Sequence, residues 1–489
     1  MALADSITGT TSTSSGQALS TGAARAGTST PQDIYNAFLQ DASLGASILR
    51  IGEFLVVFGI LLFALSFLFA RLRSRAKTQE ARHPLSRSAA YGMIALGIAI
   101  AGIGAYWKSD AARIPAIFSD ANVSQAVWES YKRQYVEPSS GRTIDPTRRL
   151  STTSEGESYT MLRAVWLDDQ ETFDHSWQWT RSHLERPDDH LFSWIYGRNA
   201  DGAYGTLAEL GGEHSASDAD TDIALALVFA YARWQDPRYL ADARQIADSI
   251  WNTEVVTING RPYLAAGNVE KKIKKDTILV NPSYLAPYAY RLFARIDPTH
   301  PWDSLVDSSY GLLEESIVSP LDKNKSAGLP PDWLQIDRKT GAITALVSGV
   351  QTTNYSYDAM RAPWRIALDW KWYGDPRARR LLDRMSFLKT EWHKRGLLYA
   401  SYGHDGSLRS TYEAPAVYGG SMGYFSVSDP REAADVYRER LLILFDPDTN
   451  TWRVPLSYYD ANWVWFGMAL YNDQLPNLAR DLSGLSTNQ

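Results

Sequence analysis

The stretch from Thr221 to Trp234 is apolar on nearly every helical face, which predicts a helix that is buried on all sides. Asp236 and Pro237 follow at once, and an Asp N-cap with Pro in the first turn predicts the start of a second helix. This second helix has one apolar face, formed by Leu240, Ala243, Ala247, Ile250 and Trp251. A buried helix followed by an amphipathic one is what two layers of helices require, so we predict a mostly α domain.

Similar helical patterns recur along the chain, at 161–184, 284–296, 357–373, 377–393, 431–444 and 459–472. Long alternating runs of the kind typical of strands are scarce. A chain of 489 residues, of which 45% are hydrophobic and 21% charged, suits one large folded domain with an appendage. The periodicity favours a mostly α domain, but by itself it does not specify a closed barrel.

Two apolar runs near the N-terminus have the length of membrane-spanning helices. Residues 54–70 and 89–107 contain no charged side chain. Each run can cross a hydrocarbon core of roughly 30 Å at about 1.5 Å per residue. We therefore predict two transmembrane helices within 49–107, after a flexible tail over 1–48 that starts with a Ser-, Thr- and Gly-rich segment. Two buried core helices are the alternative interpretation.

The loop between the two apolar runs is basic. Residues 71–88 hold six Lys and Arg residues and one acid, Glu80. Short loops rich in Lys and Arg stay in the cytoplasm. We therefore expect the tail and the domain at 108–489 to lie on the extracytoplasmic, periplasmic side of the membrane.

Carboxylates gather at three predicted helix starts, among small and aromatic residues. The three places are Ser154-Glu155-Gly156-Glu157-Ser158-Tyr159, the run 215–222, and Tyr355-Ser356-Tyr357-Asp358-Ala359-Met360-Arg361. Helix capping alone explains any one of them, because an acid at a helix N-terminus gains about 0.3–1 kcal/mol. Three together favour a carboxylate-lined cleft. Glycosidic cleavage requires such a cleft, with one acid to donate a proton and one carboxylate to activate water or attack.

Other chemistries fit the sequence less well. The spacing of Asp218, Asp220 and Asp222 resembles a calcium loop, but Ile223 stands where that loop needs Gly, and Phe229 where it needs Glu. Neither H-E-x-x-H, G-x-S-x-G, a P-loop nor a dinucleotide fingerprint occurs, and the chain has no cysteine. We therefore expect neither a cofactor nor a metal. The net charge of −6 also argues against nucleic-acid binding.

The carboxylate motifs resemble those of glycoside hydrolase family 8, which includes bacterial cellulases of cellulose-synthesis operons. Further motifs match in the same order, namely Gly141-Arg142-x-Ile144-Asp145-Pro146, Asn281-Pro282-Ser283-Tyr284, Pro331-Asp332-Trp333 and Tyr458-Tyr459-Asp460. The resemblance covers about 125–470. It implies an (α/α)6 barrel that cleaves β-1,4 links in cellulose, xylan, chitosan or mixed-linkage glucan, mostly with inversion.

Carried over residue by residue, the resemblance assigns roles to the three acids. Glu155 would be the general acid and Asp358 the general base. Asp218 would hold the sugar at the cleavage point in a distorted ring shape, and Tyr357 and Arg361 would shape the same subsite.

Glu157 departs from the usual family pattern, because relatives often have Gln there. A second acid near Glu155 would help to keep Glu155 protonated, and it also opens the alternative that Glu157 shares the acid role.

Aromatic residues are candidates for sugar binding, because flat rings pack well on the C–H faces of sugars. Core packing is the alternative for each of them. The candidates are Trp128, Trp194, Tyr284, Trp333 and Tyr412.

The leading functional hypothesis is a membrane-anchored, endo-acting hydrolase of β-1,4-glucan that is linked to exopolysaccharide synthesis. Its expected partners are the polysaccharide, the membrane and a polysaccharide synthase complex. One alternative is the same chemistry on xylan, chitosan or another exopolysaccharide. A second is a non-catalytic glucan-binding subunit of a membrane synthase, although the presence of all three acids favours hydrolysis.

Overall fold

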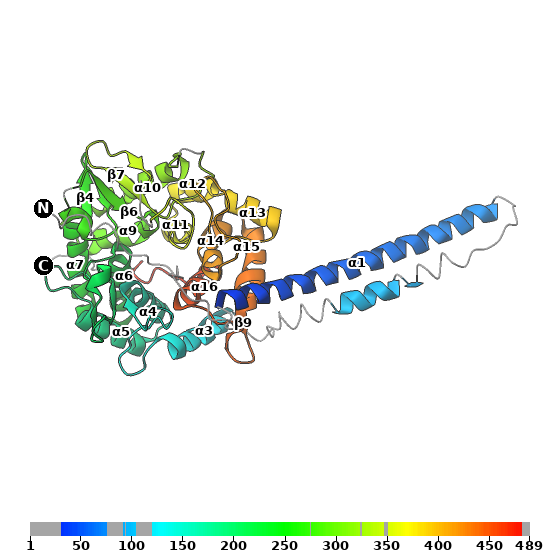
Figure 1. Cartoon of the computed structure of the whole chain (residues 1–489), viewed down its shortest axis with the longest axis horizontal. Coiled ribbons are helices and arrows are strands. Elements are labelled where there is room, and N and C mark those ends of the chain that lie inside the picture. Colours follow the sequence, from blue (N-terminus) through cyan, green and yellow to red (C-terminus); the bar gives the residue numbers. More distant parts are fainter. Residues whose placement is uncertain are drawn as a thin grey trace.

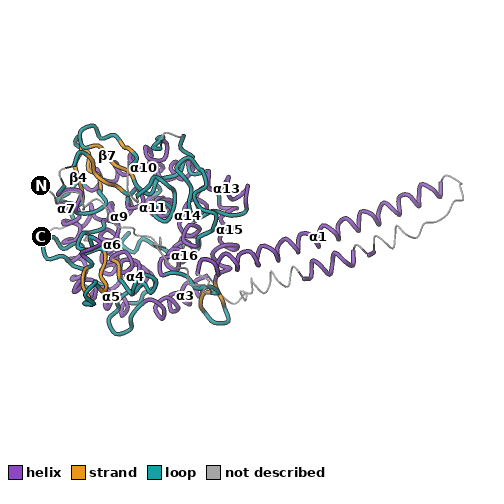
Figure 2. Tube along the Cα trace, viewed as in Figure 1, coloured by secondary structure: helices purple, strands orange, loops and turns teal. Residues whose placement is uncertain are grey.

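The computed structural model describes residues 31–75, 91–92, 94–103, 120–273, 275–322, 325–346 and 351–481. A helical globule begins at α3 (Asp120–Tyr135), and the long helix α1 (Pro31–Arg75) projects from it (Figure 1). The helical residues 94–103 run back beside α1 (Figure 2). Gly52 and Gly97 permit this approach, because a Cβ at Gly52 would lie 2.2 Å from the backbone nitrogen of Ala101.

Six helices form a closed inner ring in the described part of the globule. They are α4 (Ser154–Trp166), α6 (Ser217–Trp234), α9 (Pro287–Ile296), α11 (Arg361–Tyr373), α14 (Pro415–Ser428) and α16 (Tyr458–Tyr471). Each helix contacts the next, and α16 contacts α4, so the ring closes.

An outer helix packs on each inner one. Helix α3 packs on α16, and the other outer helices are α5 (Gln170–His183) on α4, α7 (Pro237–Thr253) on α6, α10 (Trp302–Val318) on α9, α12 (Pro376–Arg384) on α11 and α15 (Pro430–Val436) on α14. A further outer helix, α13 (Phe387–Arg395), also contacts α14. This arrangement is the (α/α)6 barrel that the family resemblance implies.

The predicted pair of a buried and an amphipathic helix is confirmed. Helix α6 is buried from Ser217 to Ala230. Helix α7 begins as expected, because the side chain of Asp236 accepts a hydrogen bond from the backbone N–H of Arg238 at 2.9 Å. Four of the five predicted apolar positions of α7 are buried, namely Leu240, Ala243, Ala247 and Ile250.

Short antiparallel strands fill the connections between helices. One sheet has the order β1 (Thr152–Thr153), β2 (Ile195–Arg198), β3 (Tyr204–Thr206), and another has the order β6 (Thr277–Val280), β7 (Leu334–Asp337), β8 (Ile343–Thr344). Two-stranded pairs join β4 (Val255–Ile258) to β5 (Arg261–Leu264) and β9 (Phe445–Asp446) to β10 (Thr451–Trp452), and α8 (Val269–Lys272) follows β5. The first sheet matters for the site. Thr153 pairs with Ile195, and the backbone N–H of Ser154 donates to the carbonyl of Trp194 at 3.1 Å, which fixes the start of α4.

Two of the predicted helical runs are interrupted. The prediction of one helix over 161–184 is wrong, because Asp168 has a left-handed backbone with φ of 61° and Asp169 then caps the start of α5. The run 377–393 is likewise divided between α12 and α13.

The N-terminal segment differs from its prediction. Helix α1 begins at Pro31, so residues 31–48 are helical rather than part of a flexible tail, and residues 1–30 lie outside the described residues. Pro31 and Asp33 are residues that favour the first turn of a helix, and both follow the Ser- and Thr-rich segment.

The two predicted transmembrane helices within 49–107 are not supported. Among the helices of the described residues, none has both the length and the apolar character that crossing a membrane requires. Much of the basic loop and parts of the second apolar run, including 104–107, lie outside those residues.

Candidate active site

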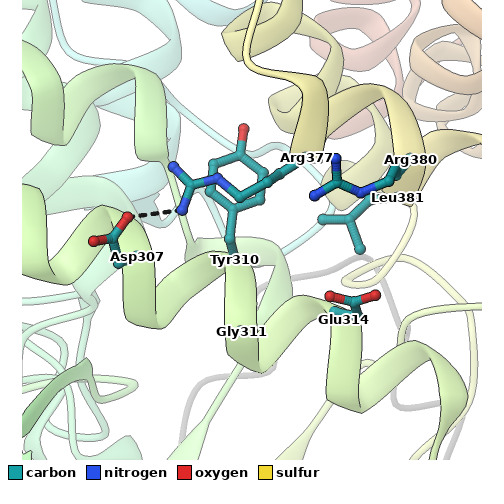
Figure 3. Close-up of a pocket in the computed structure, with 7 residues that line it drawn as sticks. All are labelled: Asp307, Tyr310, Gly311, Glu314, Arg377, Arg380 and Leu381. Atoms are coloured by element: carbon teal, nitrogen blue, oxygen red, sulfur yellow. Dashed lines mark hydrogen bonds and ion pairs between the residues drawn. The ribbon is translucent and has the colours of Figure 1, made fainter.

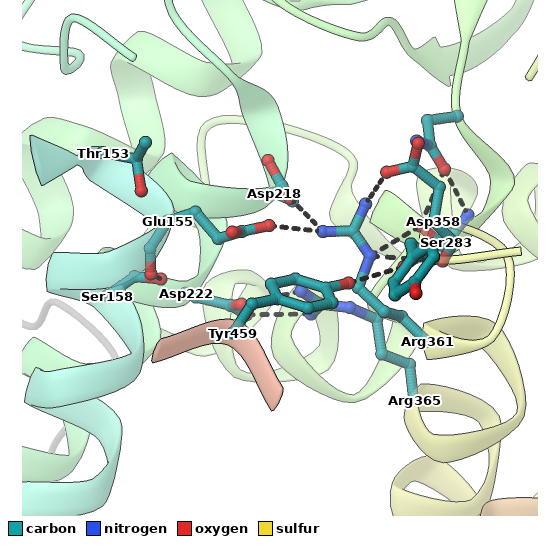
Figure 4. Close-up of polar contacts among 12 residues, drawn as sticks. Thr153, Glu155, Ser158, Asp218, Asp222, Ser283, Asp358, Arg361, Arg365 and Tyr459 are labelled. Atoms are coloured by element: carbon teal, nitrogen blue, oxygen red, sulfur yellow. Dashed lines mark hydrogen bonds and ion pairs between the residues drawn. The ribbon is translucent and has the colours of Figure 1, made fainter. Parts of the chain in front are cut away.

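The guanidinium of Arg361 lies at the centre of a buried carboxylate cluster (Figure 4). Its Nη1 donates to Glu155 Oε2 at 2.8 Å and to Asp218 Oδ2 at 2.9 Å, and its Nη2 donates to Asp358 Oδ1 at 2.6 Å. The fold therefore brings all three predicted catalytic acids to one cation, although Glu155 and Arg361 are 206 residues apart. Each acid lies at or just before the start of an inner helix, so these helix starts meet at one end of the barrel.

A second ionic layer lies one helical turn further along the same two helices. Arg365 donates to the two oxygens of Asp222 at 2.8 and 2.6 Å. Asp218 and Asp222 are four residues apart on α6, as Arg361 and Arg365 are on α11, so each pair shares a helix face. These two layers join α6 to α11 and hold Arg361 in place.

The carboxyl group of Glu155 is held between two inner helices. Thr153 caps α4 by accepting a hydrogen bond from the backbone N–H of Gly156 at 3.0 Å. On the other side, the hydroxyl of Tyr458, in the first turn of α16, donates to Glu155 Oε1 at 3.0 Å. Both oxygens of Glu155 therefore have a fixed partner, Arg361 on one and Tyr458 on the other.

Burial raises the pKa of Glu155 to about 7. The charge of Arg361 and the hydrogen bond from Tyr458 act against this rise, whereas the charges of Asp218 and Asp358 add to it. A carboxyl group with a pKa near 7 keeps a substantial fraction of its protons at neutral pH. It can therefore act as a general acid.

Asp358 is positioned by residues of the Pro331-Asp332-Trp333 motif. Asp332 Oδ1 accepts hydrogen bonds from the backbone N–H groups of Ser356 at 3.1 Å and Ala359 at 2.8 Å, which holds the turn on both sides of Asp358. Trp333 Nε1 donates to Asp358 Oδ2 at 3.0 Å. The two oxygens of Asp358 thus bind different donors, Trp333 and Arg361.

Glu157 belongs to a separate polar network. Its Oε1 accepts from the backbone N–H of Thr143 at 2.7 Å, and its Oε2 accepts from the hydroxyl of Ser176 on α5 at 2.6 Å. Burial raises the pKa of Glu157 to about 8, so this carboxyl is mainly protonated at neutral pH. The hypothesis that Glu157 shares or tunes the acid role of Glu155 is therefore wrong, because Glu157 links α4 to α5 and the 143 segment.

Three of the predicted sugar-binding aromatics have no open face. Trp128 is 0% exposed in α3, where its Nε1 donates to Asp169 at 2.9 Å, so its predicted role in sugar binding is wrong. Tyr284 is 1% exposed and lies 5.0 Å from the guanidinium of Arg361. It packs edge-on against Trp333, which is also buried. Tyr284 and Trp333 therefore pack against residues of the ionic cluster, Tyr284 against Arg361 and Trp333 against Asp358.

The remaining aromatic candidates are Trp194, whose carbonyl binds the residue before Glu155, and the pair Tyr357 and Tyr412. Trp194 is mostly buried, with its Nε1 donating to the carbonyl of Gly211 at 2.9 Å and the Arg148 guanidinium 5.9 Å from its ring. Tyr357 directly precedes Asp358, and burial, the charge of Asp460 and the phenol of Tyr412 raise the pKa of Tyr357. Tyr412 is 38% exposed, so it offers the most accessible ring of the set.

Several residues of the site carry no role in the sequence analysis. Tyr458 donates to Glu155, Asp332 accepts from the backbone beside Asp358, and Ser283 accepts a hydrogen bond from Arg361 Nε at 3.1 Å. All three lie within motifs that match the family, so these motifs could have indicated their place in the site. The Arg365–Asp222 pair has a different signal, the repeated spacing of four residues in both helices.

A pocket of about 220 Å³ lies elsewhere, between the outer helices α10 and α12 (Figure 3). Arg377 spans it, with Nη1 bonded to Asp307 at 2.7 Å and the guanidinium 4.4 Å from the ring of Tyr310. None of the clustered carboxylates lines this pocket, so it is separate from the candidate active site.

Within the residues that the structure describes, no group of three or more His, Asp or Glu side chains is arranged to hold a metal ion. In the carboxylate cluster, Arg361 provides the counter-charge.

The comparisons with known proteins identify the family of the chain. Residues 105–437 match the model of glycosyl hydrolases family 8. The chain is 28% identical to Endoglucanase A of Acetivibrio thermocellus over 375 residues, which cover 74% of this chain and 72% of the relative. It is 30% identical to an endoglucanase of Salmonella typhi over 295 residues, or 60% of this chain and 74% of that protein.

Solved structures share the fold. The endo-1,4-D-glucanase from Vibrio fischeri ES114 is 25% identical, with a TM-score of 0.61 over 71% of this chain and 94% of that one. The endo-beta-1,4-glucanase CMCax from Acetobacter xylinum is 23% identical, with a TM-score of 0.56 over 73% and 99% of the two chains. Together with the family match over most of the chain, these likenesses establish that the protein is a glycoside hydrolase and belongs to glycosyl hydrolases family 8.

Proposed function

We propose that this protein is an endo-acting hydrolase of β-1,4-glucan that works by inversion, with Glu155 as acid and Asp358 as base. The observation that carries the proposal is the binding of Glu155, Asp218 and Asp358 to the single guanidinium of Arg361. One cation balances one carboxylate charge, so a proton retained among the three acids is favoured. Glu155 has a pKa of about 7, so it can carry that proton at neutral pH.

The proposed reaction needs two proton transfers. Glu155 donates its proton to the glycosidic oxygen as the bond from that oxygen to C1 breaks. Asp358 accepts a proton from a water whose oxygen bonds to C1 from the opposite face, which inverts the configuration. Asp218 would hold the sugar in a distorted ring at the cleavage point. After the reaction Glu155 is ionised and Asp358 is protonated, so solvent must exchange one proton at each.

The choice of β-1,4-glucan follows the relatives, whose names are endoglucanase, endo-1,4-D-glucanase and endo-beta-1,4-glucanase. Xylan, chitosan and another exopolysaccharide are the alternative substrates for the same chemistry. A glucan-binding subunit without hydrolysis is the alternative from another class.

The test is reducing-end release from carboxymethyl cellulose, xylan and chitosan by the full chain and its Glu155→Gln variant. We expect the wild type to cut carboxymethyl cellulose and Glu155→Gln to be inactive. Glu157→Gln is the matched control, since Glu157 is a buried acid two residues away that bonds to other partners, and it should stay active. Binding of cellulose without cutting by the wild type would favour the non-catalytic alternative. Cutting of xylan or chitosan alone would change the substrate.

We further propose that the N-terminal helices anchor the enzyme in a membrane, with the catalytic domain on the extracytoplasmic side, near a machinery that exports exopolysaccharide. The uncharged runs 54–70 and 89–107 and the basic loop between them support this. Large apolar side chains of α1 are also exposed, among them Phe54, Ile60 and Leu61.

Membrane fractionation with a carbonate wash tests this anchor. We expect the wild type to stay in the membrane fraction. Leu61→Arg should weaken retention, because an Arg in the middle of a span costs about 2.5–3.5 kcal/mol. Ile34→Arg, outside the run, is the control. Complete release of the wild type by carbonate would refute the anchor without affecting the proposed hydrolysis.

A further inference from the structure

The beginning of α1 is packed into the catalytic domain. Tyr35 is 1% exposed, Leu39 is also buried, and Phe38 packs against the domain core. Gln32 Nε2 donates a hydrogen bond to the backbone carbonyl of Glu413. We call residues 31–39 the α1 root.

The α1 root covers a polar and aromatic network of the domain. Glu413 accepts hydrogen bonds from the hydroxyl of Tyr418 and from Arg440 Nε, the latter at 3.0 Å. Burial raises the pKa of Tyr35, and the charges of Tyr418, Glu413 and Arg440 act on its phenol, so Tyr35 lies against this network. The contact therefore combines the apolar packing of Tyr35, Phe38 and Leu39 with the hydrogen bond from Gln32.

Glu413 directly follows Tyr412 in the chain, so Gln32 binds the carbonyl one residue beyond the exposed ring. The carbonyl of Tyr412 itself accepts a hydrogen bond from the backbone N–H of Ala400 at 2.8 Å. The phenol of Tyr412 acts on that of Tyr357 and helps to raise its pKa, and Tyr357 directly precedes Asp358. The carbonyl of Tyr357 is held in turn by the hydroxyl of Tyr459 at 2.5 Å.

We propose that the α1 root is a positioning element of the active site, which holds Tyr412, and through it Tyr357, in the orientation that binds the sugar chain. The proposal rests on the proposed β-1,4-glucan substrate. It differs from a purely structural role of α1, because it assigns the effect to one segment, 412–413, and to one step, substrate binding. The acids themselves are held by Arg361, Tyr458 and Trp333, so their chemistry does not depend on α1.

The first test compares Tyr35→Ala with Ile34→Ala in the full chain in detergent. Ile34 is the adjacent residue of the same helix and is 38% exposed, so it is a matched control. We expect Tyr35→Ala to raise KM for carboxymethyl cellulose by about 3–10-fold while kcat stays within about twofold, the pattern of lost substrate binding. Ile34→Ala should match the wild type. A fall in kcat with an unchanged KM would overturn the proposal.

A double-mutant cycle with Tyr412→Phe then tests the route of the effect. If the α1 root acts through the Tyr412 hydroxyl, Tyr35→Ala should cause little further rise in KM in a protein that already carries Tyr412→Phe. Full additivity of the two changes would overturn the proposal. Gln32→Ala, which removes one hydrogen bond and leaves the packing of Tyr35 and Leu39, should raise KM in the same direction if Tyr35→Ala fails to fold. An unchanged KM for Gln32→Ala would then count against the proposal.

Binding measurements separate this inference from the proposed function. Calorimetry with a soluble β-1,4-glucan oligosaccharide can compare Glu155→Gln with Glu155→Gln/Tyr35→Ala, since neither should hydrolyse it. A higher Kd in the double variant supports the positioning role of the α1 root even if the wild type fails to cut the polymers. An equal Kd refutes that role even if the wild type is active.

Discussion

Replacing Tyr458 by Phe is expected to make Glu155 keep its proton to higher pH. The hydroxyl of Tyr458 donates to Glu155 Oε1 at 3.0 Å, and this bond favours the ionised carboxylate. A hydrogen bond to a charged group is worth about 1.5–3 kcal/mol, and one pKa unit corresponds to about 1.4 kcal/mol. The Phe ring keeps the site dry, so burial still raises the pKa. From a starting value of about 7, we expect the pKa of Glu155 to rise by roughly one unit or more.

The assay is kcat/KM for a soluble glucan as a function of pH, because its alkaline limb reports the acid of the free enzyme. A general acid is active only when protonated. The kcat/KM of the wild type should therefore fall above about pH 7, and that of Tyr458→Phe should fall at a pH about one unit higher. Tyr459→Phe is the control, since Tyr459 bonds to the carbonyl of Tyr357, and its limb should stay in place. A limb that does not move in Tyr458→Phe, or that moves to lower pH, would refute the assignment of Glu155 as the acid.

Three further predictions concern Glu157, Trp333 and Trp128. The pKa of Glu157 is raised from 4.5 to about 8, so this residue contributes stability that is present below pH 4.5 and lost as the pH rises through about 8. Glu157→Gln should remove that part of the pH dependence in urea titrations, and an unchanged dependence would contradict the burial argument. Trp333→Phe should lower kcat about tenfold, because Asp358 loses a donor worth roughly 1.4 kcal/mol, and an unchanged single-turnover rate would exclude this role. Trp128→Phe should lower the free energy of unfolding by about 1 kcal/mol through loss of its bond to Asp169, with unchanged oligosaccharide binding by calorimetry. Weaker oligosaccharide binding by the variant would show that Trp128 takes part in sugar binding.

The sequence was most informative where a helix start and an acid coincide. Local motifs predicted that Glu155, Asp218 and Asp358 share one site, and each lies at or just before the start of an inner helix, at the same end of the barrel. The buried run of α6 and the cap at Asp236 followed from helical periodicity and from backbone hydrogen bonding.

The sequence was least informative for side chains whose environment depends on distant segments. A Trp has the same identity in a core as on a sugar-binding surface, so the burial of Trp128 could not be inferred from α3 alone. Glu157 was assigned to the acid site because it is close in sequence. On a helix, however, residues two apart face different directions, and its partners Thr143 and Ser176 come from elsewhere.

The α1 root has a helical pattern of its own in the sequence. Tyr35, Phe38 and Leu39 have the spacing of one helical face, which predicts an amphipathic contact ahead of the apolar run. The Ser- and Thr-rich composition of the preceding residues favoured a tail instead. The break at Asp168 could not be anticipated either, because a left-handed backbone at a non-glycine residue depends on the packing around it.

The stereochemistry of cleavage tests the central claim most directly. Proton NMR can follow the anomeric signals of a soluble β-1,4-glucan oligosaccharide in the first minutes after the enzyme is added, before mutarotation. A site in which Glu155 protonates the leaving oxygen and Asp358 activates water predicts that the α-anomer forms first and the β-anomer follows by mutarotation. Initial formation of the β-anomer would show retention, and it would contradict the assignment of Asp358 as the base.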